Sequence, residues 1–190
     1  MLDVQLTGIE DLVVITPEVH TDIRGYLFES FTPETLIALG IEPKTYVKHN
    51  KSFSRRGVLR GFHFQEEPYS QAKYVGVDKG AVLDVVVDLR PESRTFGHTY
   101  SVILSEENRK TMFVPERFGH AYLSLSGETK FEYLCFAPYN KSAERGLLWN
   151  SLEVDWELKR HCLSEDDLII KETDREWPTF AEYKATLSKK

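Results

Sequence analysis

Short segments rich in β-forming residues recur at nearly regular intervals through the middle of the chain. Valine, tyrosine, phenylalanine and leucine dominate these segments, several of them alternate apolar with polar residues, and glycine, proline or asparagine usually ends them. They span residues 81–91, 98–105, 110–118, 121–127 and 130–138. Strands at such spacing are typical of an antiparallel β-sandwich or barrel, so the sequence predicts an all-β fold.

Helical patterns are scarce by comparison. The clearest covers residues 32–41, where Thr32 is expected to cap the helix, Pro33 to start its first turn and Gly40 to close it. A second short helix is expected within residues 177–187. The helical content of the predicted fold is therefore a few short pieces.

Four glycines lie close together in a region that otherwise resembles strands, at Gly57, Gly61, Gly76 and Gly80. Glycine inside a strand marks a bulge, a tight corner or a place where a ligand comes close to the backbone. A small curved barrel needs the first two, and a pocket inside it needs the third. The functional region is therefore expected around residues 57–80.

The composition restricts both the domain count and the partners. Because no repeat, low-complexity stretch or linker interrupts the sequence, residues 1–190 are expected to form a single domain. A net charge of −6 leaves no cationic surplus to neutralise phosphates, so no nucleic-acid partner is expected. Local basic groups can still hold a small anionic ligand, which leaves a phosphorylated substrate open.

Two cysteines, Cys135 and Cys162, lie far apart with no CxxC spacing, which predicts free thiols in a reducing compartment. The first residues include acidic side chains and lack the basic start of a signal peptide. No apolar run approaches the ~18 residues that a membrane-spanning helix needs. A cytoplasmic protein without a membrane partner is expected.

Three interpretations are open for His63, which stands between Phe62 and Phe64. It is a general base, a metal ligand, or an interior histidine satisfied by a hydrogen bond. His120 begins an apolar strand and has the same interpretations. His20 and His98 stand beside residues typical of turns and are expected to be exposed.

The metal interpretation requires a particular pattern. Small barrels that bind divalent metals usually supply His-x-His, a glutamate and a distant histidine. Here Gln65 occupies the second position, so His63, Gln65 and His120 form a weak set for zinc or iron. No metal site is predicted.

Nucleophilic catalysis has no support from a known motif, because GxSxG and a phosphate-binding glycine loop are both missing. Proton transfer remains, which needs a base, an acid and a group that stabilises negative charge. The candidates are His63 as base, Tyr133 as acid and Lys73 as the cation. Taken alone, Tyr133 is an ordinary strand aromatic and Lys73 an ordinary solvated cation.

Several motifs occur together in a fixed order: HTDIRGYLFESF, GVLRGFHFQ, QAKYVGVDKGAVLDVVVDLRPESRTFG, FVPERFGHAYLSLS and FEYLCFAPYNKSAERGLLWN. Across residues 20–182 the chain resembles the dTDP-4-dehydrorhamnose 3,5-epimerase family. The resemblance implies a jelly-roll cupin fold with no metal and no cofactor. It also implies an isomerase that inverts C3 and C5 of a dTDP-linked 4-keto-6-deoxyhexose.

The same resemblance implies a catalytic set. His63 matches the family's base, which works with an aspartate from the C-terminal segment. Asp174 and Asp167 are both candidates for that aspartate, and Asp174 is preferred because the proline and the FAE that follow it also fit. Tyr133 matches the acid that returns a proton on the opposite sugar face, and Lys73 matches the lysine beside the C4 oxygen.

Two further residues are expected beside the reacting sugar. His120 is close to it by resemblance, as a neutral donor and not a second base, and Tyr139 shapes the sugar pocket. Asp84 projects from the strand at 81–91 and is expected to pair with Lys73, since an unpaired interior charge is costly.

Substrate binding is implied in the same way. Arg60 matches an arginine on the diphosphate, and Arg24 matches one that reaches in from the partner subunit. Arginine suits phosphate because its planar fork donates two parallel hydrogen bonds. Glu29 matches a residue on the nucleobase and Asn50 one near the phosphates. The implied assembly is a homodimer with exchanged N-terminal strands.

The chain also departs from the family pattern. Lys48 and His49 stand where glutamine and aspartate are usual, which places a cation in the substrate-binding region and bears on nucleotide preference. Leu134, Ala137 and Pro138 differ beside the acid tyrosine. The alternatives are therefore an epimerase of C3 alone or C5 alone, acting on a dTDP-, CDP- or GDP-linked sugar. A non-catalytic nucleotide-sugar-binding cupin and a metal-dependent cupin enzyme are further options.

Overall fold

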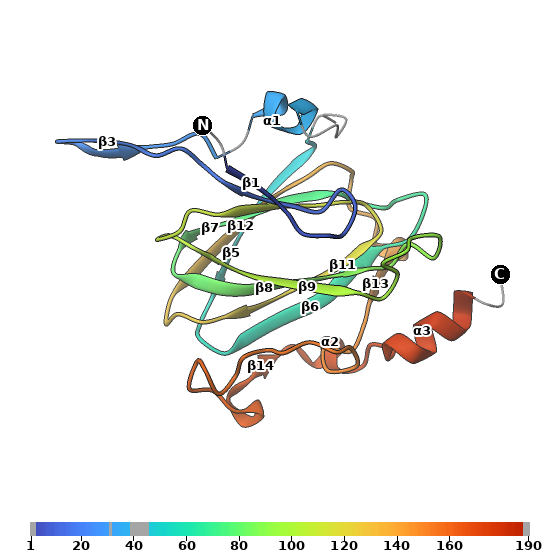
Figure 1. The fold of residues 1–190 in the computed structure, drawn as a ribbon. Coiled ribbons are helices and arrows are strands. Elements are labelled where there is room, and N and C mark those ends of the chain that lie inside the picture. The colour runs from blue at the N-terminus through green and yellow to red at the C-terminus, as the bar shows by residue number, and fades with distance from the viewer. Residues whose placement is uncertain (1–2, 31, 39–45, 188–190) are drawn as a thin grey trace.

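The computed structural model describes residues 3–30, 32–38 and 46–187, and most of its strands lie in two packed sheets (Figure 1). The first sheet contains, in spatial order, β1 (Asp3–Leu6), β2 (Val13–Thr16), β10 (Thr111–Val114), β7 (Lys73–Lys79), β12 (Thr129–Cys135) and β5 (Lys48–Ser54). The second contains β13 (Glu144–Gly146), β6 (Val58–Gln65), β11 (Phe118–Ser124), β8 (Ala81–Asp88) and β9 (Thr99–Ser105), with β14 (Ile169–Ile170) pairing with β6. Apart from the parallel β14–β6 pair, the paired strands in these described residues are antiparallel.

The remaining elements lie outside the sandwich. A hairpin of β3 (His20–Asp22) and β4 (Gly25–Leu27) extends away from the sheets, as Figure 1 shows at the upper left. The helical pieces are α1 (Pro33–Ala38), η1 (Lys141–Ala143), η2 (Glu165–Asp167), α2 (Glu172–Arg175) and α3 (Phe180–Leu187). The C-terminal segment, drawn in orange and red, runs beneath β6.

Strand β8 is buried on both faces of its sheet. Its residues Val82 and Val86 point into the space between the two sheets. The alternate residues Leu83 and Val85 point the other way, into a second apolar cluster that the C-terminal segment covers. A strand buried on both faces shows a nearly continuous apolar run, which is the pattern of residues 81–88. Asp84 and Asp88 are the polar exceptions, and both are fully buried.

The five β-rich segments correspond to β8 to β12, so the predicted strands are present. The segment at 110–118 ends earlier than predicted, because β10 stops at Val114. Pro115 lacks a backbone donor and Arg117 has a φ of 65°, so the chain turns there. β11 then begins at Phe118, not at residue 121 as predicted.

Both predicted helices are present within the described residues. α1 begins at Pro33 as expected, whereas the predicted closure at Gly40 lies outside the described residues. α3 begins at Phe180, because Thr179 and Glu182 form reciprocal hydrogen bonds at its start: the Thr179 backbone N–H donates to Glu182, and the Glu182 N–H donates to Thr179 Oγ1. The described residues contain no helix long and apolar enough to cross a membrane.

Other predictions concern single residues. Cys135 and Cys162 are free thiols, as predicted. His20 and His98 are exposed, also as predicted.

Gly61 shows why a glycine is needed within β6. Its φ is +113°, and a Cβ atom there would lie 2.5 Å from the His120 carbonyl oxygen. The β6–β11 register shifts between His120 and Tyr122, opposite this glycine. Of the roles expected for the four glycines, Gly61 therefore has that of a bulge, where the backbones of β6 and β11 lie close together.

We expect Gly61→Ala to lower the free energy of unfolding. A side chain at this φ costs about 1–3 kcal/mol in backbone strain, and the clash with His120 adds to that cost. Denaturant unfolding measures the loss. Gly127→Ala is the control, since nothing lies within 4 Å of the position of its Cβ. Equal stability of the two variants would contradict the packing described.

Candidate active site

A pocket of about 280 Å³ opens between the two sheets. Strands β5, β7 and β12 of the first sheet contribute to its lining, and β6 and β13 of the second sheet do so from the other side. The lining residues are Lys48, Asn50, His63, Phe64, Gln65, Gln71, Lys73, Tyr133, Cys135, Tyr139 and Glu144. The pocket thus brings together His63, Lys73, Tyr133 and three of the residues predicted to bind substrate.

His63 and Asp174 form a hydrogen-bonded pair, with 3.0 Å between His63 Nε2 and Asp174 Oδ1. Helix α2 carries Asp174 against β6, and the Gly61 backbone N–H points at its second oxygen at 3.5 Å. The Asp174 side chain is 6% exposed, whereas that of His63 is 36% exposed. The carboxylate is therefore buried behind an imidazole that solvent and ligand can reach.

Burial alone raises the pKa of the Asp174 carboxyl, but the hydrogen bond and charge of His63, together with the hydrogen bond from the Gly61 N–H, outweigh burial. The net effect is a pKa below the ordinary value. Asp167, the other candidate, lies at an exposed site in η2. Its carboxylate accepts hydrogen bonds from the Ser164 backbone N–H at 2.8 Å and from the Ser164 hydroxyl at 2.7 Å. Asp167 is thus a capping residue, and Asp174 is the carboxylate beside His63.

The lowered pKa of Asp174 predicts a pH dependence of folding stability. The folded protein binds this proton less readily than the unfolded chain, so the contribution is full above the ordinary pKa of 3.8. It is lost as the pH falls through the lower, folded-state value. We expect wild type to be more stable than Asp174→Asn at neutral pH, with a difference that shrinks below pH 3.8.

Denaturant unfolding across this pH range measures the difference. Asp166→Asn, at an exposed aspartate, controls for the loss of one negative charge. A stability difference that stays constant with pH would show that the ionised carboxylate contributes nothing through His63.

A second histidine–aspartate pair lies next to the first. His120 is the cross-strand partner of His63, and its Nε2 lies 2.9 and 3.0 Å from the two carboxylate oxygens of Asp84. Both residues are buried. Burial raises the pKa of Asp84, although His120 and Lys73 oppose the shift.

The predicted pairing of Asp84 with Lys73 is wrong, because the Asp84 carboxylate is hydrogen-bonded to His120 instead. Asp84 lies directly opposite Tyr122 on β11, so His120, two residues along, is the diagonal neighbour on the same face. The His120 imidazole is therefore the hydrogen-bond partner of the Asp84 carboxylate. Lys73 interacts with Asp84 through charge, with no ion pair within 4.0 Å among the residues described.

Lys73 lies on β7 and lines the pocket. Burial lowers the pKa of its ammonium, while neighbouring acidic groups, Asp84 among them, oppose the shift. In the described part of the chain no carboxylate forms an ion pair with it. The amine of Lys73 is therefore open to a ligand in the pocket.

Tyr133 comes from the opposite sheet to His63. It lies on β12, paired with Asn50 on β5, and lines the same pocket. Burial raises the pKa of its phenol, and Cys135 and Tyr122 add to the shift. The hydroxyl is therefore protonated at neutral pH, and its strand lies in the sheet opposite that of His63.

The rim of the pocket carries an aromatic ring between two charges. The Lys48 ammonium lies 5.5 Å from the centroid of the Tyr139 ring, and the Tyr139 hydroxyl donates to Glu144 at 2.8 Å. Sequence reasoning did not select Glu144 or Gln71, which also line the pocket. Both follow turn residues, and no local motif distinguishes them from solvated polar residues.

The other predicted binding residues do not line this pocket. Arg60 donates to Ser54 Oγ at 3.2 Å and to the Phe53 carbonyl at 3.1 Å, at the surface of β6. Arg24 forms an ion pair with Asp22 on the projecting hairpin and its side chain is 85% exposed. Glu29 follows the hairpin and is exposed.

A larger hollow of about 640 Å³ lies over Trp149 and Trp156 in the C-terminal segment, and it contains none of the predicted site residues. The described residues contain no group of three His, Cys, Asp or Glu side chains close enough to hold a metal ion. An imidazole, a phenol and an amine line the pocket of His63, and these are residue types that proton transfer uses.

Comparison with known proteins adds a family to this geometry. The family profile described as dTDP-4-dehydrorhamnose 3,5-epimerase matches residues 6–182. The dTDP-4-dehydrorhamnose 3,5-epimerase of Methanothermobacter thermautotrophicus is 42% identical over 178 residues, 93% of each chain.

Solved structures agree with that match. The enzyme of the same name from Elizabethkingia anophelis superimposes with a TM-score of 0.89 at 37% identity, covering 95% of this chain and 97% of that one. A 3′-monoepimerase from Streptomyces bikiniensis superimposes with a TM-score of 0.86 at 30% identity, covering 96% and 89%. The all-β jelly-roll cupin fold expected from the sequence is thereby confirmed.

Proposed function

Because the chain belongs to the dTDP-4-dehydrorhamnose 3,5-epimerase family and is an isomerase, we propose that it inverts C3 and C5 of a dTDP-linked 4-keto-6-deoxyhexose. One observation carries the proposal. His63, backed by Asp174, and Tyr133 lie on opposite sheets and line one pocket. Inversion of a carbon needs this arrangement, because the proton leaves on one face and returns on the other.

Deprotonation uses the His63–Asp174 pair. When the imidazole Nε2–H donates to Asp174, the lone pair on Nδ1 is left to take the proton next to the C4 ketone. The C–H electron pair moves into an enolate, and the charge collects on the C4 oxygen. Asp174 stabilises the imidazolium that forms, and Lys73 stabilises the oxyanion.

Reprotonation uses Tyr133. Its hydroxyl is protonated at neutral pH and faces the pocket from the other sheet. Transfer of this proton to the carbon inverts the centre and leaves a tyrosinate opposite an imidazolium. Exchange with solvent restores both groups, so each turnover places a solvent hydrogen on the sugar. The same steps at the other carbon complete the double inversion.

His120 serves as a neutral hydrogen-bonding group beside the sugar in this proposal. Its Nε2 is engaged by Asp84, and it is the cross-strand neighbour of His63. His120 therefore orients the substrate and leaves proton abstraction to His63.

The nucleotide is held by residues at the pocket edge and by a second copy of the chain. Arg60 binds the diphosphate, Asn50 and Lys48 lie beside it, and the partner subunit's Arg24 and the partner's Glu29 complete the site. The exposed apolar side chains Ile23 and Leu27 on the projecting hairpin support a homodimer with exchanged strands, since such a surface favours burial.

The testing experiment is incubation with dTDP-4-keto-6-deoxyglucose in D₂O, with deuterium read at C3 and C5 by NMR. Label at both carbons and a rhamnose-configured product support the proposal. Label at one carbon would support the second candidate, a single-centre epimerase, which the likeness to the 3′-monoepimerase favours. If dTDP-, CDP- and GDP-linked 4-keto sugars all stay unlabelled, the proposal is overturned, and either another sugar is the substrate or the chain only binds nucleotide sugars.

A further inference from the structure

Gln65 lies on β6 two residues after His63, and the residue is 6% exposed. Its Nε2 donates to the Tyr69 carbonyl at 2.7 Å and to the Pro138 carbonyl at 3.2 Å. Its Oε1 accepts from the Asn140 backbone N–H at 2.7 Å. One buried side chain thus joins β6 to two loops of the pocket.

Two of these contacts enclose Tyr139. The Pro138 carbonyl belongs to the peptide plane before Tyr139, and the Asn140 N–H belongs to the plane after it. Each peptide unit is rigid, so a residue's backbone direction depends on how its two flanking planes are turned. Because both planes are bonded to Gln65, this amide fixes φ and ψ of Tyr139.

The neighbouring contacts support the same arrangement. Gln65 and Glu144 are directly paired between β6 and β13, and the Tyr139 hydroxyl reaches Glu144. The Tyr139 ring is therefore held at its base by Gln65 and at its tip by the residue that pairs with Gln65. Tyr139 itself is 51% exposed, so packing alone does not hold it.

We propose that Gln65 is a positioning residue that holds Tyr139 at the mouth of the sugar pocket, an inference that rests on the proposed function. The position needs two donors and one acceptor on a single short side chain. Glutamine supplies all three, glutamate supplies acceptors only, and neutral histidine supplies one donor. The residue that departs from the metal-binding pattern thus has a role that the metal-binding residue cannot perform.

The test is Gln65→Glu, which places a carboxylate against two carbonyl oxygens. We expect the KM for the nucleotide sugar to rise roughly tenfold with a smaller change in kcat, because one or two hydrogen bonds are lost. A buried carboxyl between carbonyls has a raised pKa. Its protonated form regains a donor, so the KM ratio of variant to wild type is expected to fall as the pH is lowered.

A double variant shows whether the effect passes through Tyr139. Tyr139→Ala removes the ring, so adding Gln65→Glu to it is expected to change KM less than twofold. Independent effects that multiply would overturn the proposal. Gln5→Glu is the matched control, because Gln5 is an exposed glutamine that donates to Tyr100 at 3.2 Å, away from the pocket.

Hydrogen exchange measured by mass spectrometry gives a readout that does not depend on activity. Gln65→Glu is expected to speed amide exchange within residues 136–141 and to leave β8 unchanged; unchanged exchange in both would overturn the proposal. If Gln65→Glu does not fold, Gln65→Met, of nearly equal volume without polar atoms, takes its place. A wild-type protein that fails to epimerise overturns the proposed function, and the exchange data still decide whether Gln65 holds the segment.

Discussion

Replacing His63 with alanine is expected to abolish deuterium incorporation at both C3 and C5. His63 is the pocket residue backed by a buried carboxylate, and removal of a general base typically costs about 10²–10⁴-fold in rate. Affinity for the nucleotide sugar should stay within a few-fold, because the imidazole acts on the reacting carbon and not on the nucleotide. NMR in D₂O measures the exchange, and calorimetry measures binding.

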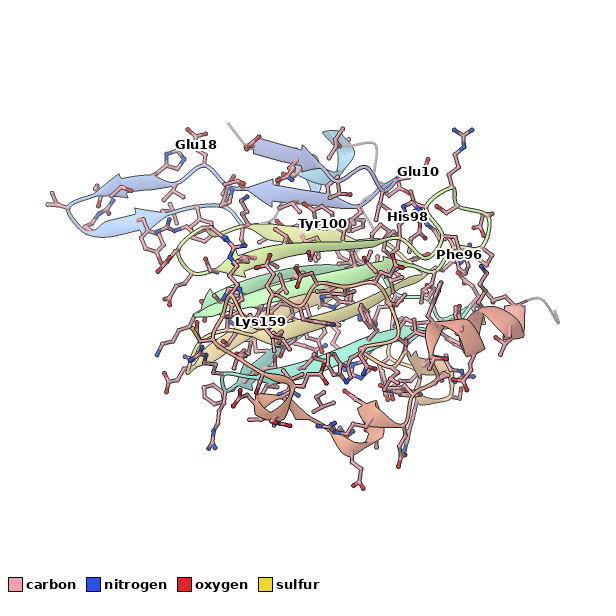
Figure 2. The ribbon with its side chains drawn as sticks, turned by 60° about the horizontal axis from the view of Figure 1, so that its bottom comes forward. Glu10, Glu18, Phe96, His98, Tyr100 and Lys159 are labelled. Atoms are coloured by element: carbon pink, nitrogen blue, oxygen red, sulfur yellow. The ribbon has the colours of Figure 1, made fainter. Side chains whose placement is uncertain are left out.

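The control for this variant is His98→Ala. His98 is exposed just before β9, where Figure 2 labels it, and no role in the pocket is assigned to it. Exchange at the wild-type rate in His63→Ala would remove His63 as the base. Loss of exchange together with loss of binding would show that the variant damages the pocket as a whole.

Tyr133→Phe is expected to separate the two halves of the reaction. Deprotonation by His63 survives, and the imidazolium exchanges its proton with D₂O. His63 then returns deuterium to the face from which the proton was removed, so deuterium still enters the sugar. Inversion needs the hydroxyl on the opposite sheet, and we expect its rate to fall about 10²–10⁴-fold. The measurement compares deuterium content with product configuration in the same sample.

Tyr100→Phe is the matched control. Tyr100, which Figure 2 labels, lies on β9, and its hydroxyl accepts a hydrogen bond from Gln5 and not from a residue of the pocket. Epimerisation at the wild-type rate in Tyr133→Phe would place the acid elsewhere in the pocket. Loss of exchange as well as inversion would mean that Tyr133 acts before the enolate forms.

Local patterns predicted the strands well because alternation and turn residues act over short distances. The run at 81–88 indicated a strand, although the pattern alone does not show that the C-terminal segment buries its second face. The early end of β10 follows from Pro115 and the left-handed Arg117, a backbone state that sequence rarely indicates.

The sequence identified most of the residues that line the candidate site, but it did not identify which histidine pairs with which carboxylate. Sequence left Asp174 and Asp167 as alternatives, because spacing along the chain does not show which carboxylate a short helix brings against β6. The prediction that Lys73 is the partner of Asp84 was wrong for a similar reason. Sheet register makes His120 its diagonal neighbour, and register is a property of paired strands that neither strand shows alone.

The His63–Asp174 pair also sets when activity can appear during synthesis. The two residues are 111 positions apart, and the strands that form most of both sheets lie between them in the sequence. A nascent chain that has passed β12 already holds His63, Lys73 and Tyr133, but no carboxylate backs the imidazole. If Asp174 supports the base as we propose, we expect a nascent chain to be inactive until Asp174 has left the ribosome and α2 has docked against β6.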